Sequence, residues 1–123
     1  MQIDPKHGPT LNSLGYMYAE QGIKLNEAEG LIKRALEQEP ENGAYLDSLG
    51  WVYFKKKNFK KAEDYLKKAI SFQEDPEIYA HLGDLYLELK DTKEAVKYYK
   101  DGLRRFPESE QLRDKLKKYG KEN

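Results

Sequence analysis

The chain has 123 residues, of which 36% are charged, and its 22 Lys and Arg residues balance its 22 Asp and Glu residues. A length of this order predicts one domain, and a net charge of zero gives no overall field for binding nucleic acid or an anionic membrane. Because the chain contains no cysteine, disulfides and thiol chemistry are excluded, and no apolar run approaches the roughly 20 residues that span a bilayer.

The predicted elements are all helices, because apolar residues recur at helical spacing and no useful alternating strand pattern appears. The first helix is expected over about residues 9–21 and should end at Gly22, since glycine is favoured just past a helix C-terminus. Asn26 is expected to cap the second helix, with Glu29 as its capping-box partner. That helix should end near Gln38.

The later helices begin at residues that cap helix N-termini. Side chains of Asn, Asp and Ser accept hydrogen bonds from the free N–H groups of a first turn. The sequence therefore predicts N-caps at Asn42, Asn58, Asp75, Asp91 and Ser109. The third, fourth, sixth and seventh helices should end near Lys56, Phe72, Arg105 and Tyr119.

A short pattern, Leu-Gly-x-x-Tyr, occurs in the first, third and fifth predicted helices. Its glycines are Gly15, Gly50 and Gly83, which lie 35 and then 33 residues apart. Such a period is typical of a repeat architecture. Because Gly in a helix interior costs about 0.5–1 kcal/mol relative to Ala, three glycines in phase indicate that another helix crosses there too closely for a side chain.

The second helix of each pair carries two small residues seven positions apart, which places both on one helix face. These pairs are Ala28 and Ala35, Ala62 and Ala69, and Ala95 and Gly102. Together with Leu-Gly-x-x-Tyr and with Pro40 and Pro107 at unit ends, they resemble the tetratricopeptide repeat (TPR) family over about residues 3–119. The resemblance implies an all-α solenoid of three helix-turn-helix repeats with a C-terminal capping helix.

The same resemblance sets the expected boundaries. The ranges are 8–42, 43–75 and 76–108 for the repeats, 109–120 for the capping helix and 121–123 for a tail. Residues 1–7 look like the remnant of a preceding repeat, so we expect a piece of a longer, bacterial-type TPR protein. The compartment stays open, with a soluble, cytoplasmic location slightly favoured.

Each first helix carries a second row of side chains, about 100° around the helix from its core row. In the TPR family this row lines a concave groove that holds a partner's peptide. The resemblance therefore implies a groove formed by Asn12, Tyr16, Ala19, Asp47, Trp51, Phe54, Ala80, Asp84 and Leu87.

We interpret Tyr16, Trp51 and Phe54 as an exposed aromatic centre, which with a polar rim is typical of a binding hot spot. The alternative is that Trp51 and Phe54 pack against neighbouring helices. The acidic rim favours a partner that has apolar anchors and some Lys or Arg, bound as an extended chain or a helix. The rim residues are Glu20, Asp47, Asp84 and Glu88.

Some TPR domains hold the C-terminal carboxylate of chaperones with a clamp of Lys, Asn and Arg. The corresponding positions of this sequence lack the clamp, and Glu77 would repel a carboxylate. A chaperone-tail receptor is therefore not expected. The positions are Asn12, Tyr16, Ser48, Glu77 and His81.

The lysines of the middle repeat are a separate feature. We interpret them as a solvated face balanced by nearby acids, with a site for an acidic partner or phosphate as the alternative. They are Lys55, Lys56, Lys57, Lys60, Lys61, Lys67 and Lys68.

The predicted function is a non-enzymatic protein–protein interaction module with a scaffold or adaptor role. The alternative is a structural spacer or self-assembling unit whose N-terminal face, with Leu11, Leu14 and Met17, binds another copy. No cofactor or metal is expected, because His7 and His81 lack the converging ligands that metal binding or acid/base catalysis requires.

Overall fold

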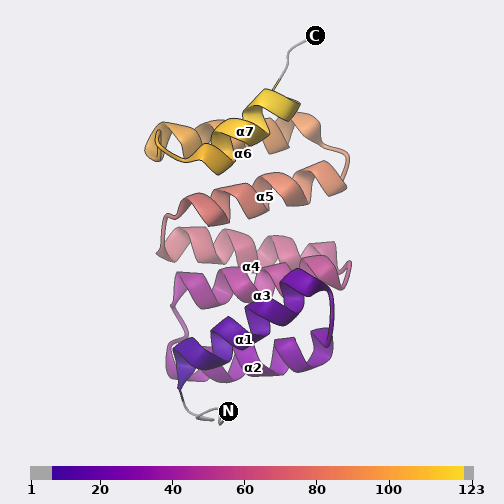
Figure 1. Ribbon diagram of the computed structural model, residues 1–123, viewed down its shortest axis with the longest axis vertical. Coiled ribbons are helices and arrows are strands. Elements are labelled where there is room, and N and C mark those ends of the chain that lie inside the picture. Colours follow the sequence, from indigo (N-terminus) through magenta and orange to yellow (C-terminus); the bar gives the residue numbers. More distant parts are fainter. Residues whose placement is uncertain (1–6, 121–123) are drawn as a thin grey trace. The chain divides into compact units, whose positions relative to one another are not determined.

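The computed structural model describes residues 7–120, and within that part the chain is entirely helical, as predicted. It forms α1 (Gly8–Gln21), α2 (Leu25–Gln38), α3 (Gly43–Lys55), α4 (Phe59–Phe72), α5 (Pro76–Glu88), α6 (Thr92–Arg105) and α7 (Glu110–Tyr119) (Figure 1). These helices fall into two compact units, one with α1–α4 that ends at Gln73 and one with α5–α7 that begins at Glu74. The predicted remnant, apart from His7, and the predicted tail lie outside the described residues.

Most helix termini are where local sequence signals predict them. Gly22 ends α1 in the left-handed conformation, with φ of 70°. Five of the six predicted side-chain caps accept a hydrogen bond from a first-turn N–H, which satisfies a donor that the helix leaves free. These caps are Asn42 to Tyr45, Asn58 to Lys61, Asp75 to Glu77, Asp91 to Glu94 and Ser109 to Leu112.

The predicted start of α2 is wrong. The helix begins at Leu25, one residue before Asn26, because Lys24 adopts a left-handed conformation (φ 50°) and its carbonyl accepts the first helical bond. Asn26 therefore lies inside the first turn, where its Oδ1 accepts a hydrogen bond from Lys56 Nζ at 2.6 Å.

The N-cap of α1 is His7, whose Nδ1 accepts a hydrogen bond from the backbone N–H of Thr10 at 3.2 Å.

The close crossings predicted at the three glycines are confirmed. A Cβ atom added to any of these glycines would lie far inside van der Waals distance of a fully buried side chain on the paired helix. These contacts position the two helices of each hairpin, so a larger residue would have to push them apart. The added Cβ would lie 2.7 Å from Ile32 Cγ1 at Gly15 and 2.8 Å from Leu66 Cγ at Gly50, and closer still to the Tyr99 ring at Gly83.

In the first unit, α1 packs against α2 and α3, and α3 also packs against α2 and α4. A carboxylate joins α2 to α3: Glu29 accepts hydrogen bonds from Tyr53 Oη and Lys56 Nζ, both at 2.7 Å. It also pairs with Lys33 on its own helix at 2.7 Å. Burial raises the pKa of Glu29, but the hydrogen bonds from Lys33, Lys56 and Tyr53 outweigh it and lower that pKa to about 2.

In the second unit, α5 pairs with α6, and α7 packs on α6 and also reaches α5. Leu112 of α7 is fully buried, and a Cβ added at Gly102 of α6 would lie 2.8 Å from its Cδ1. Lys115 of α7 also pairs with Asp84 of α5 at 2.9 Å. The other face of α7 is polar and exposed, so this helix covers the third hairpin.

Across residues 7–120, none of the helices combines the length and the apolar character that crossing a bilayer requires.

We expect Gly83→Ala to destabilise the protein by about 2 kcal/mol or more, because the new methyl group would overlap the buried ring of Tyr99. Gly30→Ala is the matched control. Gly30 is an exposed α2 residue with no atom within 4 Å of an added Cβ, so alanine there should stabilise by about 0.5–1 kcal/mol. Urea denaturation of both variants measures the two effects, and equal effects of the same sign would contradict the close crossing.

We expect Glu29→Gln to destabilise the protein by about 1–2 kcal/mol at neutral pH, because the substitution removes charge-assisted hydrogen bonds. The folded-state pKa of about 2 lies below the ordinary 4.5, so this stabilisation is complete above pH 4.5 and is lost as the pH falls toward 2. The difference between wild type and variant should shrink over that window. Urea denaturation as a function of pH measures it, with the exposed Glu37→Gln as control.

Candidate functional site

Six of the predicted groove residues lie on two helices of the first unit that pack directly against each other. We call this surface the α1/α3 face. A hydrogen bond ties its two helices together, because Trp51 Nε1 on α3 donates to Glu20 Oε1 on α1 at 2.8 Å. The residues of the face are Asn12, Tyr16 and Ala19 from α1 and Asp47, Trp51 and Phe54 from α3.

The prediction that Trp51 is an exposed anchor is wrong, because only 7% of this residue is accessible. Its indole stacks on the Phe54 ring, with centroids 4.5 Å apart and an interplanar angle of 6°. Lys55 Nζ lies 5.5 Å from the centroid of the indole. The ring and the N–H of Trp51 both make contacts inside the first unit. Trp51 therefore packs against neighbouring helices, which is the alternative interpretation given for this side chain.

The other residues of the α1/α3 face differ in exposure. Ala19 is fully buried and Asp47 is 6% exposed, whereas Asn12, Tyr16 and Phe54 are partly exposed. Asn12 Oδ1 is buried and accepts no hydrogen bond within the described chain. An unsatisfied buried acceptor costs about 1–3 kcal/mol, so a donor brought to Asn12 would relieve that cost.

The remaining predicted groove residues, Ala80, Asp84 and Leu87, lie on α5 in the second unit. Ala80 is fully buried and Leu87 is partly exposed. The expectation that Asp84 gives a polar contact to a partner needs correction, because its carboxylate accepts a hydrogen bond from Tyr99 Oη and pairs with Lys115. Burial, and then this bond to Asp84, raise the pKa of Tyr99, which therefore stays a neutral donor.

Comparison with known proteins decides the family. The model of the family described as "Anaphase-promoting complex, cyclosome, subunit 3" matches residues 21–102, well over half of the chain. The chain belongs to this family of tetratricopeptide-repeat (TPR) proteins. A TPR repeat-containing protein of Pseudomonas aeruginosa is 37% identical over 81 residues, which are 66% of this chain and 14% of that protein.

Solved TPR structures share the fold. A thermophilic TPR protein of Thermus thermophilus superposes with a TM-score of 0.85 at 25% identity, over 94% of this chain and 64% of that one. The first TPR domain of Spaghetti (RPAP3), solved with an HSP90 peptide, gives 0.80 at 24% identity, over 96% of each chain. The predicted all-α TPR solenoid is therefore confirmed.

The N-terminal face of this TPR chain is less apolar than the sequence predicts. Leu11 is fully buried in a core cluster with Leu31, Ala35 and Tyr45, and Leu14 packs against that cluster. Of the three residues predicted for self-association, Met17 is the one with a large exposed fraction, 46%. A single methionine provides little area for binding a second copy.

Each of the two histidines of the TPR chain contacts neighbouring groups of its own helix. His7 caps α1, and His81 is 3% exposed with its Nε2 3.2 Å from Glu77 Oε2. Within residues 7–120, no cluster of three or more His, Cys, Asp or Glu side chains could hold a metal ion.

We expect Glu20→Ala to destabilise the first unit by about 1–2 kcal/mol, because the buried indole N–H of Trp51 loses its acceptor. Trp51 is the chain's only tryptophan, so its fluorescence emission should shift to longer wavelength as water reaches the indole. Glu37→Ala, which removes an exposed carboxylate from α2, is the control. An unchanged emission spectrum and unchanged stability in Glu20→Ala would show that this hydrogen bond does not hold the face together.

Proposed function

We propose that this TPR chain is a protein-interaction module, with a scaffold or adaptor role, that holds a segment of a partner protein on the α1/α3 face. The observation that carries the proposal is Asn12, whose Oδ1 has no hydrogen-bond partner in the described part of the chain and which lies one turn before the partly exposed Tyr16 on α1. Rotation of the partly exposed Asn12 side chain would bring its amide to the backbone of the partner, while the partner's apolar side chains contact Tyr16 and Phe54. The RPAP3 domain, which has this fold, was solved with a bound peptide, SRMEEVD.

The chemistry of the face indicates the class of partner. Glu20 is exposed at one end of α1, whereas Asp47 of α3 is only 6% exposed. The carboxylate of Glu20 favours a segment that combines apolar anchors with Lys or Arg. A chain ending in a free carboxylate fits less well, because Ser48 and Glu77 stand where a clamp would need cationic or amide side chains.

The proposal is tested with peptides of about twelve residues, selected from a random library for binding to the whole chain. A peptide of this length forms an interface at the small end of the size range. Selected peptides should contain apolar and basic residues. Asn12→Ala and Tyr16→Ala should each weaken their binding about tenfold, the loss expected when a central contact of about 1–2 kcal/mol is removed. Met17→Ser, an exposed change on the same helix, should leave the affinity unchanged.

The opposite pattern would refute the proposal. If Met17→Ser weakens peptide binding while Asn12→Ala and Tyr16→Ala do not, the partner binds elsewhere on α1. If sedimentation equilibrium shows a dimer that Met17→Ser dissociates, and no selected peptide depends on Asn12 or Tyr16, the self-assembling alternative replaces the interaction module.

A further inference from the structure

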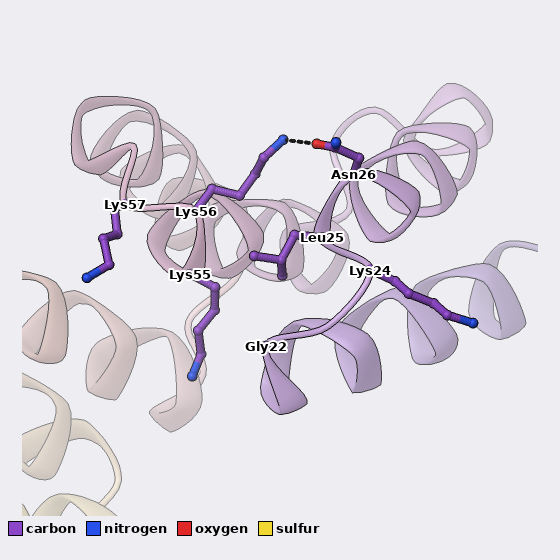
Figure 2. A pocket seen from close by; sticks show the side chains of 7 residues that line it. All are labelled: Gly22, Lys24, Leu25, Asn26, Lys55, Lys56 and Lys57. Atoms are coloured by element: carbon purple, nitrogen blue, oxygen red, sulfur yellow. Dashed lines mark hydrogen bonds between the residues drawn. The ribbon is translucent and has the colours of Figure 1, made fainter.

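A shallow, open depression of about 520 Å³ lies where the α1–α2 turn and the α3–α4 turn of the first unit meet (Figure 2). Four of the seven residues that line it are lysines, and none is acidic. We call these lysines, Lys24, Lys55, Lys56 and Lys57, the basic turn edge. The other lining residues are Gly22, Leu25 and Asn26.

Only one lysine of the basic turn edge is neutralised by a carboxylate within the described part of the chain. Lys56 pairs with Glu29 at 2.7 Å. Lys24 and Lys55 lie over aromatic rings, at 5.2 Å from the centroid of Tyr18 and 5.5 Å from that of Trp51. A ring attracts an ammonium group but does not cancel its charge. Lys24, Lys55 and Lys57 therefore keep their positive charge without an acidic partner among residues 7–120.

The neighbouring lysines of α4 behave differently. Lys60 pairs with Asp64 at 3.2 Å and Lys67 with Glu63 at 3.3 Å, each one helical turn away. On α4, then, Lys60 and Lys67 are balanced by acids, as the sequence predicts for the whole set. The turn edge differs because three lysines without an acidic partner among residues 7–120 line one depression there, and one of them, Lys24, comes from a turn distant in sequence.

The left-handed backbone at the basic turn edge is a feature of the hairpin turns in general, since Lys90 between α5 and α6 has φ of 65°. Lys24 and Lys57 have φ of 50° and 66°, in the left-handed region that costs an L-residue roughly 1–2 kcal/mol. Glycine adopts this conformation without that cost, as Gly22 does in the first of these turns. Because Lys90 has the same conformation outside the edge, this backbone geometry belongs to the hairpin turns, and a binding role for the edge rests on the lysine charges alone.

We propose that the basic turn edge binds an extended acidic segment of a partner protein. In Figure 2 the ammonium groups of Lys24, Lys55 and Lys57 point away from one another rather than toward one point. A single small anion such as phosphate would contact one of them at a time, whereas successive carboxylates of an extended chain can contact all three. A nucleic acid fits less well, because base stacking needs open aromatic rings and Lys24 and Lys55 cover those nearby.

The test uses a fluorescein-labelled peptide of about ten glutamates, followed by fluorescence anisotropy at low ionic strength, where screening is weak. The triple variant Lys24→Gln, Lys55→Gln, Lys57→Gln should bind about tenfold more weakly, as expected for three lost surface contacts of about 0.5 kcal/mol each. The triple variant Lys60→Gln, Lys67→Gln, Lys68→Gln removes the same charge from α4 and should change binding less than about twofold. Thermal melts of both variants confirm that they fold.

Four results would overturn the proposal. No binding of the peptide by wild type would mean that the edge is not a site for acidic segments. Equal losses in the two triple variants would show only general charge attraction. Tighter binding of a thymidine oligonucleotide of matched charge would make the edge a nucleic-acid site. Displacement of the peptide by inorganic phosphate, beyond that caused by sodium chloride of equal ionic strength, would make it a small-anion site. Amide shifts confined to residues 22–26 and 55–57 on peptide addition would support it.

Discussion

Each helical hairpin of this TPR protein depends on one contact, between a glycine of its first helix and a buried side chain of its second. The absence of a Cβ at Gly15, Gly50 and Gly83 lets Ile32, Leu66 and Tyr99 approach closer than any other residue would allow. This contact fixes which face of the first helix is buried inside its hairpin. The position of the second row of side chains, on which the proposed function rests, follows from it.

Internal contacts then determine how much of that second row is left for a partner. Glu20 accepts the indole N–H of Trp51, and Lys115 and Tyr99 engage Asp84. These side chains serve the fold first, because buried or half-buried polar groups are costly unless they are paired. Asn12 is the exception, since its Oδ1 is buried and has no hydrogen-bond partner among residues 7–120. The surface available for binding is thus smaller and more polar than an open aromatic groove.

The sequence predicts features that depend on neighbours in the chain and fails where partners are distant. The caps at Asn42, Asn58 and Ser109 are predictable because donor and acceptor are three residues apart. The contacts of Trp51 and Asp84 are not predictable in this way, because their partners, Glu20 and Lys115, lie on other helices and are each 31 residues away. The prediction that Asn26 caps α2 fails for a local reason, since a lysine at position 24 does not indicate the left-handed conformation found there. The basic turn edge is not predictable from the sequence either, because only the fold brings Lys24 beside the turn at residues 55–57.

The most direct test of this account is a nuclear Overhauser experiment on the three hairpin contacts in solution. We expect strong cross-peaks from the α-protons of Gly15 to the Ile32 methyl groups, from those of Gly50 to the Leu66 methyl groups, and from those of Gly83 to the Tyr99 ring. If these cross-peaks are absent and the glycine α-protons contact other side chains instead, the helices cross elsewhere and the faces described here are not formed.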